Sequence, residues 1–312
     1  MLNYNALSIK PLNFKSFTGL EVPEFDAVYT KIQESYTAYE EKRLHREDRK
    51  RRIGAGHPFK LPLRERLVML LMYHRLYVTS TLLGFLLHLG QTNVLKNIRM
   101  LEPLVKEVLP LPSKFHQKTM RLGNPDDVEA LFPGFKAFLD ATEQEVPRPR
   151  AKTKRKTHYS GKKKRHTVKT QITVNADGLI LHKTPHARGS RHDYALFKWR
   201  HPRLPDEVCL GLDLGYDGIR NDYLGLNALV PFKRRSPGRG KRGVKSVELT
   251  CEEKAFNRWL SGERVVVEHT VSRVKKFRIM AHEFRNRLKH YDTMTDIVCG
   301  LVNLRIIGIS AL

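Results

Sequence analysis

The sequence predicts an α/β protein in which an all-helical N-terminal region precedes a mixed β-sheet flanked by helices. Two changes of pattern along the chain carry this prediction. Apolar residues recur at helical spacing through roughly the first 110 residues, whereas from residue 135 short runs alternate between apolar and polar side chains in the manner of strands. Helical segments separate the later strands, and this order builds a sheet with helices packed on its faces.

A helical segment is expected first, over residues 13–44. Apolar and aromatic residues repeat there at intervals of three or four, and Glu24 and Asp26 lie near the expected start, where acidic side chains suit the helix dipole. A charged, glycine-containing link follows at 42–58. We therefore expect an N-terminal helical segment with a basic linker over residues 1–56.

Three short helices are predicted next. They are expected at 62–75, from Thr79 or Ser80 to Gly90, and from Thr92 onward. A short helix, a glycine-containing turn and a helix with a polar first turn form a helix–turn–helix pattern, which binds DNA through residues such as Thr92, Asn93 and Lys96. An ordinary three-helix bundle has the same pattern. The positive charge of the chain favours DNA contact, so residues 57–112 are expected to form a DNA-binding domain.

The remaining residues, 113–312, are predicted to form the mixed sheet and its helices. Strands are expected at 136–142, 165–175, 179–184 and 207–213, and helices at 190–200, 249–260, 262–280 and 291–307. Asp177-Gly178 is a typical hairpin turn between the second and third of these strands. The result is a single α/β domain at the C-terminal end of the chain.

Positive charge dominates the composition. The chain carries 57 Lys and Arg against 32 Asp and Glu, a formal net charge of +25, and the excess gathers at 42–52, 148–169 and 233–245. One such cluster is as often a solvated loop, but three in one chain favour binding to a polyanion such as nucleic acid. Gly238–Gly243 fits the G-x-G-x-x-G pattern, but it follows a proline rather than a strand, so a basic loop is expected there instead of a nucleotide site.

The compartment follows from what the sequence lacks. No stretch reaches the roughly 18 apolar residues of a membrane span, and the first residues do not have the pattern of a signal peptide. Cys209, Cys251 and Cys299 lie far apart and match neither a disulfide framework nor a zinc site. These observations predict a chain that stays in the reducing cytoplasm and has no membrane partner.

Three acidic residues are candidates for chemistry in this basic chain. Asp140 and Asp213 lie near the ends of predicted strands, and Glu268 lies among valines on a predicted helix. Sites in open α/β sheets collect beyond the strand ends, and hard divalent cations need oxygen ligands. Three carboxylates from different elements can hold two such ions, one at an attacking hydroxyl and one at a leaving oxygen. Each acid taken singly is more often a helix cap or an ion-pair partner.

Several motifs together resemble those of DDE transposases of the IS4/IS5 type. Asp213-Leu-Gly-Tyr216 resembles their D-x-x-Y element, Arg264-x₃-Glu268-x₆-Lys275 resembles the later part of their Y-x₂-R-x₃-E-x₆-K signature, and Asp140-Ala-Thr resembles the element that holds the first acid. Further similarities occur at Tyr159–His166, at Gly189–Asp193 and in the opening at Phe17–Phe25. Each match is weak alone, but the set follows the order of the family over nearly the whole chain.

The resemblance implies an insertion-sequence transposase, with an RNase H-like catalytic domain behind a helix–turn–helix. It implies metal-dependent cleavage of double-stranded DNA at terminal inverted repeats and strand transfer into target DNA, by a homodimer on the prokaryotic nucleoid. Asp140, Asp213 and Glu268 would be the catalytic acids and the ligands of Mg²⁺ or Mn²⁺, with two ions expected. The expected DNA contacts are Arg264 and Lys275, at phosphates near the cut, and Lys162, Lys164 and His166.

Some alternatives stay open. Ser261 replaces the signature tyrosine, which puts any contact from that ring in doubt. Asp193 is a rival for the second acid, although Ser190 and Asp193 also fit a helix-capping box, and His192 and Tyr216 are candidate supporting residues. The alternative function is a non-catalytic helix–turn–helix regulator, which would bind DNA without metal and without cleavage. A structural or RNA-associated basic protein is a second alternative.

Overall fold

The computed structural model describes residues 2–234 and 248–311. Contacts within the chain divide it into two compact units, Met1–Leu111 with Arg273–Leu312, and Pro112–Ser272. The predicted third domain, 113–312, is thus divided between the two units, because its C-terminal segment packs with the N-terminal helices. Most of the basic cluster at 233–245, including the G-x-G-x-x-G match, lies outside the described residues.

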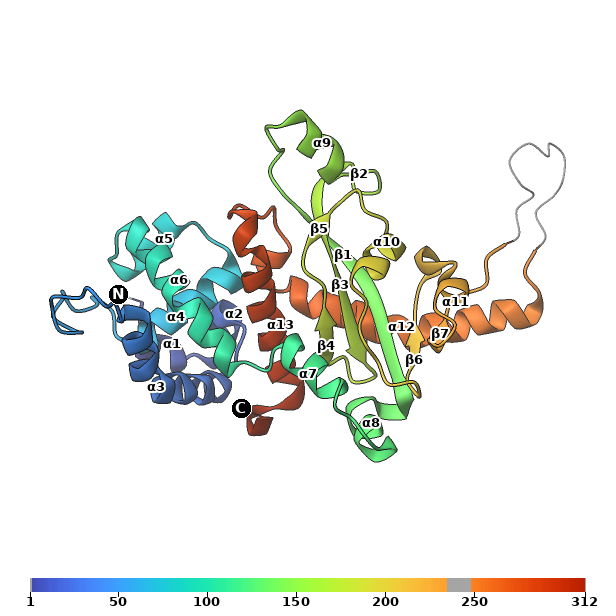
Figure 1. Ribbon diagram of the computed structural model, residues 1–312. Coiled ribbons are helices and arrows are strands. Elements are labelled where there is room, and N and C mark those ends of the chain that lie inside the picture. The colour runs from blue at the N-terminus through green and yellow to red at the C-terminus, as the bar shows by residue number, and fades with distance from the viewer. Residues whose placement is uncertain (1, 235–247, 312) are drawn as a thin grey trace. The chain divides into compact units, whose positions relative to one another are not determined.

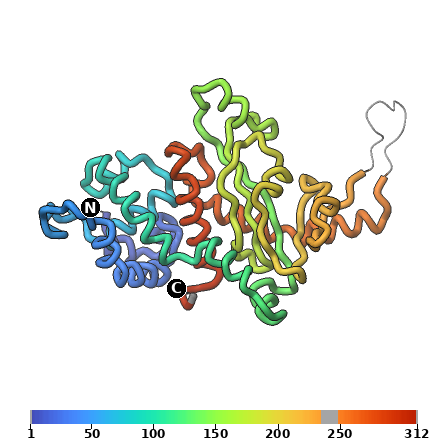
Figure 2. Tube along the Cα trace, in the orientation of Figure 1, coloured from blue at the N-terminus to red at the C-terminus, as the bar shows by residue number. Residues whose placement is uncertain are grey.

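The first unit is built from helices. Its α-helices are α1 (Tyr4–Ser8), α2 (Pro11–Thr18), α3 (Val22–Leu44), α4 (Leu63–Leu76), α5 (Ser80–Leu87), α6 (Gln91–Val108) and α13 (Tyr291–Ile307), and its 3₁₀ turns are η3 (Arg278–Met280), η4 (Leu288–His290) and η5 (Ile309–Ala311). Figure 2 shows the two ends of the chain, in blue and in red, within this unit. A core formed by both ends explains why the C-terminal segment does not belong to the sheet domain.

The helix predicted over residues 13–44 is two helices. Gly19 ends α2 with a φ of 86°, in the left-handed region where glycine is favoured. A capping box between Glu21 and Glu24 then starts α3. The apolar periodicity continues across this break, and for that reason the spacing alone predicted one helix.

Helices α4, α5 and α6 lie where three helices were predicted. Thr79 caps α5, because its hydroxyl accepts a hydrogen bond from the Leu82 amide at 3.2 Å. The turn into α6 is tight: the Leu89 amide donates to the Gly84 carbonyl at 2.8 Å, and a side chain at position 84 would strike the Leu89 carbonyl. α6 packs on both α4 and α5.

Helix α13 joins the C-terminal segment to this core, over the range that the sequence predicted. A Cβ atom on Gly300 would lie 2.9 Å from the side chain of Leu111, so the helix comes very close to the end of α6. The Asn303 side chain donates a hydrogen bond to the Pro110 carbonyl at 3.0 Å. Residues on nearly all sides of α13 are buried, both the predicted apolar face and the side of Gly300 and Asn303.

The second unit contains a seven-stranded mixed sheet. Its strands are β1 (Lys136–Glu145), β2 (Tyr159–Ser160), β3 (Arg165–Asn175), β4 (Ile180–Lys183), β5 (Ala187–Arg188), β6 (Cys209–Gly211) and β7 (Ala228–Leu229). The main order is β2-β3-β1-β6-β7, with β4 and β5 also paired to β3. β1 is antiparallel to β3 and parallel to β6. This sheet confirms the predicted α/β class and is consistent with an RNase H-like domain.

Helices flank the sheet (Figure 1). They are α7 (Pro112–Thr119), α8 (Pro125–Leu131), α9 (Lys152–His158), α10 (Asp193–Trp199), α11 (Ile219–Asp222) and α12 (Cys251–Lys275), with 3₁₀ turns η1 (Pro133–Phe135) and η2 (Leu214–Tyr216). None of the helices in the described ranges has an apolar stretch long enough to cross a membrane.

Several elements of the second unit differ from the prediction. β6 is shorter than the predicted strand at 207–213, so Asp213 lies beyond the strand, and the short strands β2, β5 and β7 were not predicted. β1 runs to Glu145 instead of residue 142, because it pairs with β3 along its whole length, and Asp140 is therefore inside the strand. The two helices predicted at 249–260 and 262–280 are the single helix α12, which ends at Lys275. Gly262 disfavours a helix by about 1 kcal/mol, and the burial of apolar neighbours on both sides outweighs that cost.

Candidate active site

The register of the sheet places Asp140 beside Asp213. The last parallel pair between β1 and β6 is Phe138 with Gly211. Asp140 lies two residues beyond this pair on one strand, and Asp213 lies two residues beyond it on the other. Parallel strands advance in the same direction at the same rise, so the two carboxylates leave the sheet at the same level, at the carboxyl end of β6.

A glycine next to Asp213 leaves room for a second carboxylate. The Gly215 amide donates to Asp213 Oδ1 at 2.8 Å, which fixes the carboxylate at the start of η2. A Cβ atom on Gly215 would lie 2.9 Å from Asp213 Oδ1 and 3.7 Å from Asp193 Oδ2. The carboxylates of Asp213 and Asp193 therefore border the same small space, and a residue with a side chain would occupy it.

Asp193 has a different role from the one that its sequence context suggested. The predicted capping box with Ser190 is wrong: His192 is the N-cap of α10 and makes no side-chain cap bond, and the Ser190 hydroxyl donates to a carbonyl outside the helix. Asp193 Oδ1 instead lies 2.8 Å from Lys169 Nζ, and the same ammonium lies 3.5 Å from Glu143 Oε1. One buried lysine thus connects α10, β3 and β1.

Tyr216 lies at the centre of the acidic group. Its side chain is fully buried, and its hydroxyl accepts a hydrogen bond from Gln171 Nε2 at 2.7 Å. Burial raises the pKa of Tyr216 well above its ordinary value, and the charges of Asp193, Asp213 and Asp140 raise the pKa further. The phenol stays protonated, and the charges of all three aspartates reach it.

The acids are only partly balanced by nearby cations. Burial raises the pKa of Asp140, and the charges of Asp213 and Asp193 raise it further. The hydrogen bond from the Ala141 amide at 2.8 Å and the charge of Arg264 lower it. The net shift is upward. Arg264 Nε is buried without a hydrogen-bond partner among the described residues, so this guanidinium keeps donor capacity for another group.

The two faces of the sheet separate the candidate acids. Directly paired residues of antiparallel strands share a face, so Asp140 lies on the face of Ile172, whereas Lys169 and Gln171 lie on the opposite face. Asp193 reaches the group from the side of Lys169 and Gln171. Asp213 leaves β6 at the strand end, beside Asp140. The register thus favours Asp213 as the acid nearer to Asp140, while the charges of both Asp213 and Asp193 act on the Asp140 carboxyl.

Carboxylate oxygens are the ligands that hard divalent cations prefer, and the acid group offers them with a negative charge that Lys169 and Arg264 compensate only in part. The residue types thus fit such an ion. Glu268 is exposed on α12, one helical turn after Arg264, and the structure does not bring it to the two aspartates. In the described part of the chain, no three His, Cys, Asp or Glu side chains are arranged to hold a metal ion.

The other predicted DNA contacts are dispersed. Lys162 and Lys164 are exposed in the turn between β2 and β3, and His166 is half-buried at the start of β3. Lys275 is the last residue of α12. In the other unit, three residues share the exposed polar side of the first turns of α6: Thr92, Asn93 and Lys96.

Sequence reasoning missed Glu143, Lys169 and Gln171. The alternation of residues in β3 placed Lys169 and Gln171 on one face of the strand. From the sequence alone, a face with polar side chains is typical of one that is exposed to solvent. The structure covers it with α10 and buries Lys169 and Gln171. Glu143 and Lys169 are directly paired across β1 and β3. A prediction of strand pairing would have brought these opposite charges together and identified both residues.

Comparison with known proteins identifies the family of the chain. A family model described as DDE superfamily endonuclease matches residues 139–303, more than half of the chain. The chain is also similar to the probable transposase for insertion sequence element IS702 of Microchaete diplosiphon. The two are 26% identical over 258 residues, which cover 82% of this chain and 85% of the relative. No solved structure matches the chain.

Proposed function

Because the chain belongs to the DDE superfamily endonucleases, we propose that it is the transposase of an insertion sequence, which cuts DNA at terminal inverted repeats and joins the ends to target DNA. The observation that supports the proposal is the register of β1 and β6, in which Asp140 and Asp213 each follow the last parallel pair by two residues. The similarity to a relative with that activity in its name extends over most of both chains.

Membership of this family implies the use of a divalent metal ion. We propose Mg²⁺ or Mn²⁺, with two ions held by Asp140 and Asp213 and with Glu268 as the third ligand from α12. When bound, such ions lower the pKa of an attacking hydroxyl and stabilise the charge on a leaving oxygen. Glu268 reaches the aspartates only if α12 moves or if the Glu268 side chain adopts another rotamer. We expect bound DNA and metal to favour the arrangement in which the three carboxylates meet.

The residues of the chain itself position the substrate. Arg264 shares a helix face with Glu268 and acts on Asp140. Its Nε has no hydrogen-bond partner among the described residues, so the guanidinium is suited to a phosphate next to the cut. Gln171 Nε2 donates to the Tyr216 hydroxyl and to the Asp193 backbone carbonyl, and so connects η2 with the start of α10. We assign Lys275, Lys162, Lys164 and His166 to the DNA backbone beyond the cut.

The proposed end-binding module is the group α4–α6. The tight turn at Gly84 and the exposed first turns of α6 are features that a helix–turn–helix needs, and we assign base contacts to Thr92, Asn93 and Lys96. Two ends must be cut and joined, so we propose a homodimer on DNA. A transposase of this kind acts on the nucleoid in the prokaryotic cytoplasm.

The test is metal-dependent cleavage of a labelled duplex that carries the DNA flanking the reading frame. Asp140→Asn and Asp213→Asn each remove a carboxylate that holds metal, and we expect each to lose about 100-fold or more of the cleavage rate. Asp206→Asn is the matched control, because Asp206 is exposed outside the acid group, and it should cut like the unchanged protein.

Two further variants decide between the candidate acids. Glu268→Gln should lose cleavage to the same extent as Asp140→Asn. Asp193→Asn should weaken cleavage less than Asp213→Asn, since its carboxylate is already paired with Lys169. Full activity of Asp213→Asn with complete loss in Asp193→Asn would transfer the role to Asp193. Tight binding of the fragment by the unchanged protein, with no cutting under any divalent metal, would favour the non-catalytic regulator.

A further inference from the structure

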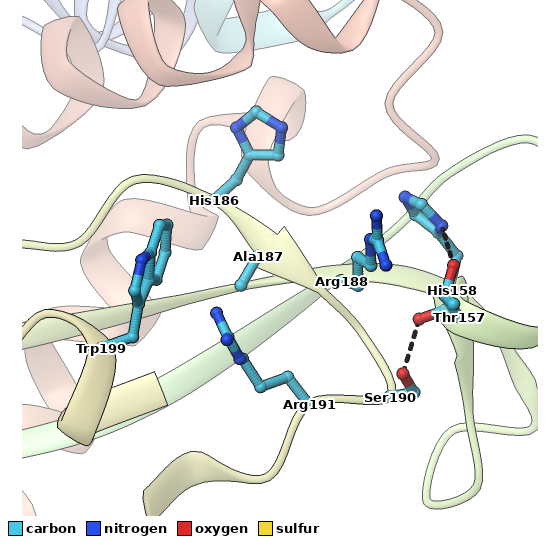
Figure 3. Close-up of a pocket in the computed structure, with 8 residues that line it drawn as sticks. All are labelled: Thr157, His158, His186, Ala187, Arg188, Ser190, Arg191 and Trp199. Atoms are coloured by element: carbon cyan, nitrogen blue, oxygen red, sulfur yellow. Dashed lines mark hydrogen bonds between the residues drawn. The ribbon is translucent and has the colours of Figure 1, made fainter. Parts of the chain in front are cut away.

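A cavity of about 640 Å³ lies in the second unit, between β5, the end of α9 and the segment around α10. Eight residues line it: Thr157, His158, His186, Ala187, Arg188, Ser190, Arg191 and Trp199. None of the eight is acidic. Figure 3 shows Trp199 and Arg191 at one end of the cavity and Arg188 and His158 at the other. A positively charged cavity with an aromatic wall is suited to an anionic ligand that carries a flat ring.

Two arginines supply the charge. In the described parts of the chain neither Arg188 nor Arg191 forms an ion pair with a carboxylate. The Arg191 guanidinium lies over the ring of Trp199, 5.0 Å from its centroid, and this cation–π contact orients the group while leaving its N–H donors available. Arginine donors in this state are typical of a phosphate site, since they bind phosphate oxygens in pairs.

The walls of the cavity are held in place before any ligand binds. β5 pairs with β3 through Arg188 and Val168, and the Gly189 amide donates to the Thr167 carbonyl at 2.9 Å. A side chain on Gly189 would collide with Thr167, so the segment fits closely against β3. The Ser190 hydroxyl donates to the carbonyl of Thr157 at 2.6 Å, which closes the side next to α9.

We propose that this cavity binds a single nucleotide unit, with its phosphate on Arg188 and Arg191 and its base against the part of the Trp199 ring that the Arg191 guanidinium leaves uncovered. The volume is within the usual range of small-molecule sites, and stacking of a base on an aromatic ring favours any base, whatever its sequence. A paired nucleotide keeps its base inside the duplex stack, so DNA supplies this ligand only where a nucleotide is unpaired.

The cavity is linked to the acid group through one side chain. Lys169 Nζ donates to the Arg191 carbonyl at 2.8 Å and pairs with Asp193 at the same distance. An unpaired nucleotide in the cavity is thus held near the strand that the acid group acts on. The inference goes beyond the proposed function, because nucleotide binding here requires neither a metal ion nor cleavage, and a free nucleotide offers the same phosphate and base.

Binding is measured by the fluorescence of Trp199. The chain has two tryptophans, so Trp259→Phe leaves Trp199 as the single indole, and Trp259 does not line the cavity. The full-length Trp259→Phe protein is titrated in EDTA with deoxyadenosine monophosphate, with inorganic phosphate and with deoxyadenosine. We expect saturable quenching by the monophosphate, with at least about tenfold weaker binding of inorganic phosphate and of the nucleoside, because each lacks one half of the contacts.

Matched variants test the two arginines in the same background. Arg188→Gln and Arg191→Gln each remove a charge-assisted contact, so each should weaken the monophosphate about tenfold or more. Arg200→Gln is the control, because Arg200 also lies over the Trp199 ring, 5.7 Å from its centroid, but does not line the cavity. The affinity of the Arg200→Gln protein for the monophosphate should change less than twofold. Arg191→Lys, which keeps the charge, should recover part of the affinity.

Competition distinguishes the two sources of the nucleotide. If the ligand belongs to the DNA substrate, a duplex with one unpaired nucleotide will displace the monophosphate at a concentration at least about tenfold lower than a blunt duplex does. If the two duplexes are equal and weak, the site takes a free nucleotide. The proposal is wrong if the monophosphate does not quench Trp199, if inorganic phosphate binds equally well, or if both Gln variants bind like the unchanged protein. Loss of cleavage in Asp140→Asn with normal quenching would separate this site from the proposed catalytic one.

Discussion

Gly215 is the residue on which the geometry of the acid group most clearly depends. Its amide holds Asp213, and its missing side chain leaves the space that the carboxylates of Asp213 and Asp193 share. A Cβ atom at 2.9 Å from a carboxylate oxygen is closer than real contacts allow, so a side chain would displace Asp213. No sequence pattern requires glycine here, because the D-x-x-Y element leaves this position open.

We predict that Gly215→Ala lowers the cleavage rate about tenfold or more, since a small displacement of a catalytic carboxylate is costly. The midpoint of thermal unfolding should change little, because the position is exposed and only one side chain has to shift. Gly225→Ala is the control, because a Cβ atom there meets no atom within 4 Å. Equal cleavage by Gly215→Ala and Gly225→Ala would show that Asp213 is not held as described.

Glu102 is a buried acid in the other unit. Burial raises its pKa from 4.5 to about 7, and the charges of Arg99 and Lys106 oppose that shift. Glu102 Oε1 has no hydrogen-bond partner among the described residues. Between the ordinary pKa and the raised pKa, the folded state keeps a proton that the unfolded state has released. The free energy of unfolding therefore falls as the pH rises from the ordinary pKa through the raised value.

We therefore expect Glu102→Gln to leave the free energy of unfolding unchanged below about pH 4.5 and to raise it above pH 7, by up to about 3 kcal/mol. Urea unfolding at a series of pH values measures the difference. Glu41→Gln changes an exposed carboxylate of α3 and should give no pH-dependent difference of this size. A Glu102→Gln curve parallel to that of the unchanged protein would contradict the assignment.

At the scale of elements, β3 organises the second unit. Its Lys169 is 7% exposed and lies between Glu143 on β1 and Asp193 on α10. The Lys169 ammonium also donates a hydrogen bond to the carbonyl of Arg191, in the segment before α10. A buried cation between two acids satisfies both, and removing it leaves two carboxylates without a counter-charge.

Lys169→Met should lower the free energy of unfolding by about 3 kcal/mol, because breaking a buried ion pair from one side costs about that amount. Lys198→Met is the matched control: Lys198 pairs with Asp222 at 2.5 Å, but both side chains are more than 40% exposed, so the cost should stay below about 1 kcal/mol. Chemical denaturation measures both. Similar values for the two variants would mean that Lys169 is better solvated than its burial indicates.

The predicted elements show where local pattern suffices. The strand at 165–175 and the helix at 291–307 were predicted with their observed limits, because each has an unbroken period of two or of 3.6. The break at Gly19 and the continuous helix through Gly262 were not predicted. A glycine ends a helix when the chain turns there and is tolerated when apolar neighbours pack on both sides, and only the packing distinguishes these cases.

At the scale of the whole molecule, charge determines how the protein meets DNA. The turn between β2 and β3 presents Lys162, Lys163 and Lys164 next to the basic helix α9 (Figure 1). We expect the logarithm of the DNA affinity to fall steeply with the logarithm of the salt concentration, because each neutralised phosphate releases counter-ions.

Replacing Lys162, Lys163 and Lys164 by Gln should reduce the slope of that dependence by about 3, because each phosphate that is no longer neutralised lowers the slope by slightly less than one unit. Binding of a labelled duplex at a series of salt concentrations, without divalent metal, measures the slope. A control triple variant removes the same charge at Lys10, Lys31 and Lys118, which are exposed on other elements, and should keep the slope. Equal slopes for both triple variants would place the DNA elsewhere.

The sequence by itself determined the α/β class, most of the strands and helices and the family, because periodicity and short motifs are properties of neighbouring residues. Only the tertiary structure decided that the C-terminal helix packs with the N-terminal unit and that Asp193 pairs with a buried lysine. It also formed the arginine-lined cavity between β5, the end of α9 and the segment around α10. These features depend on which faces meet across distant parts of the chain, and no local pattern contains that information.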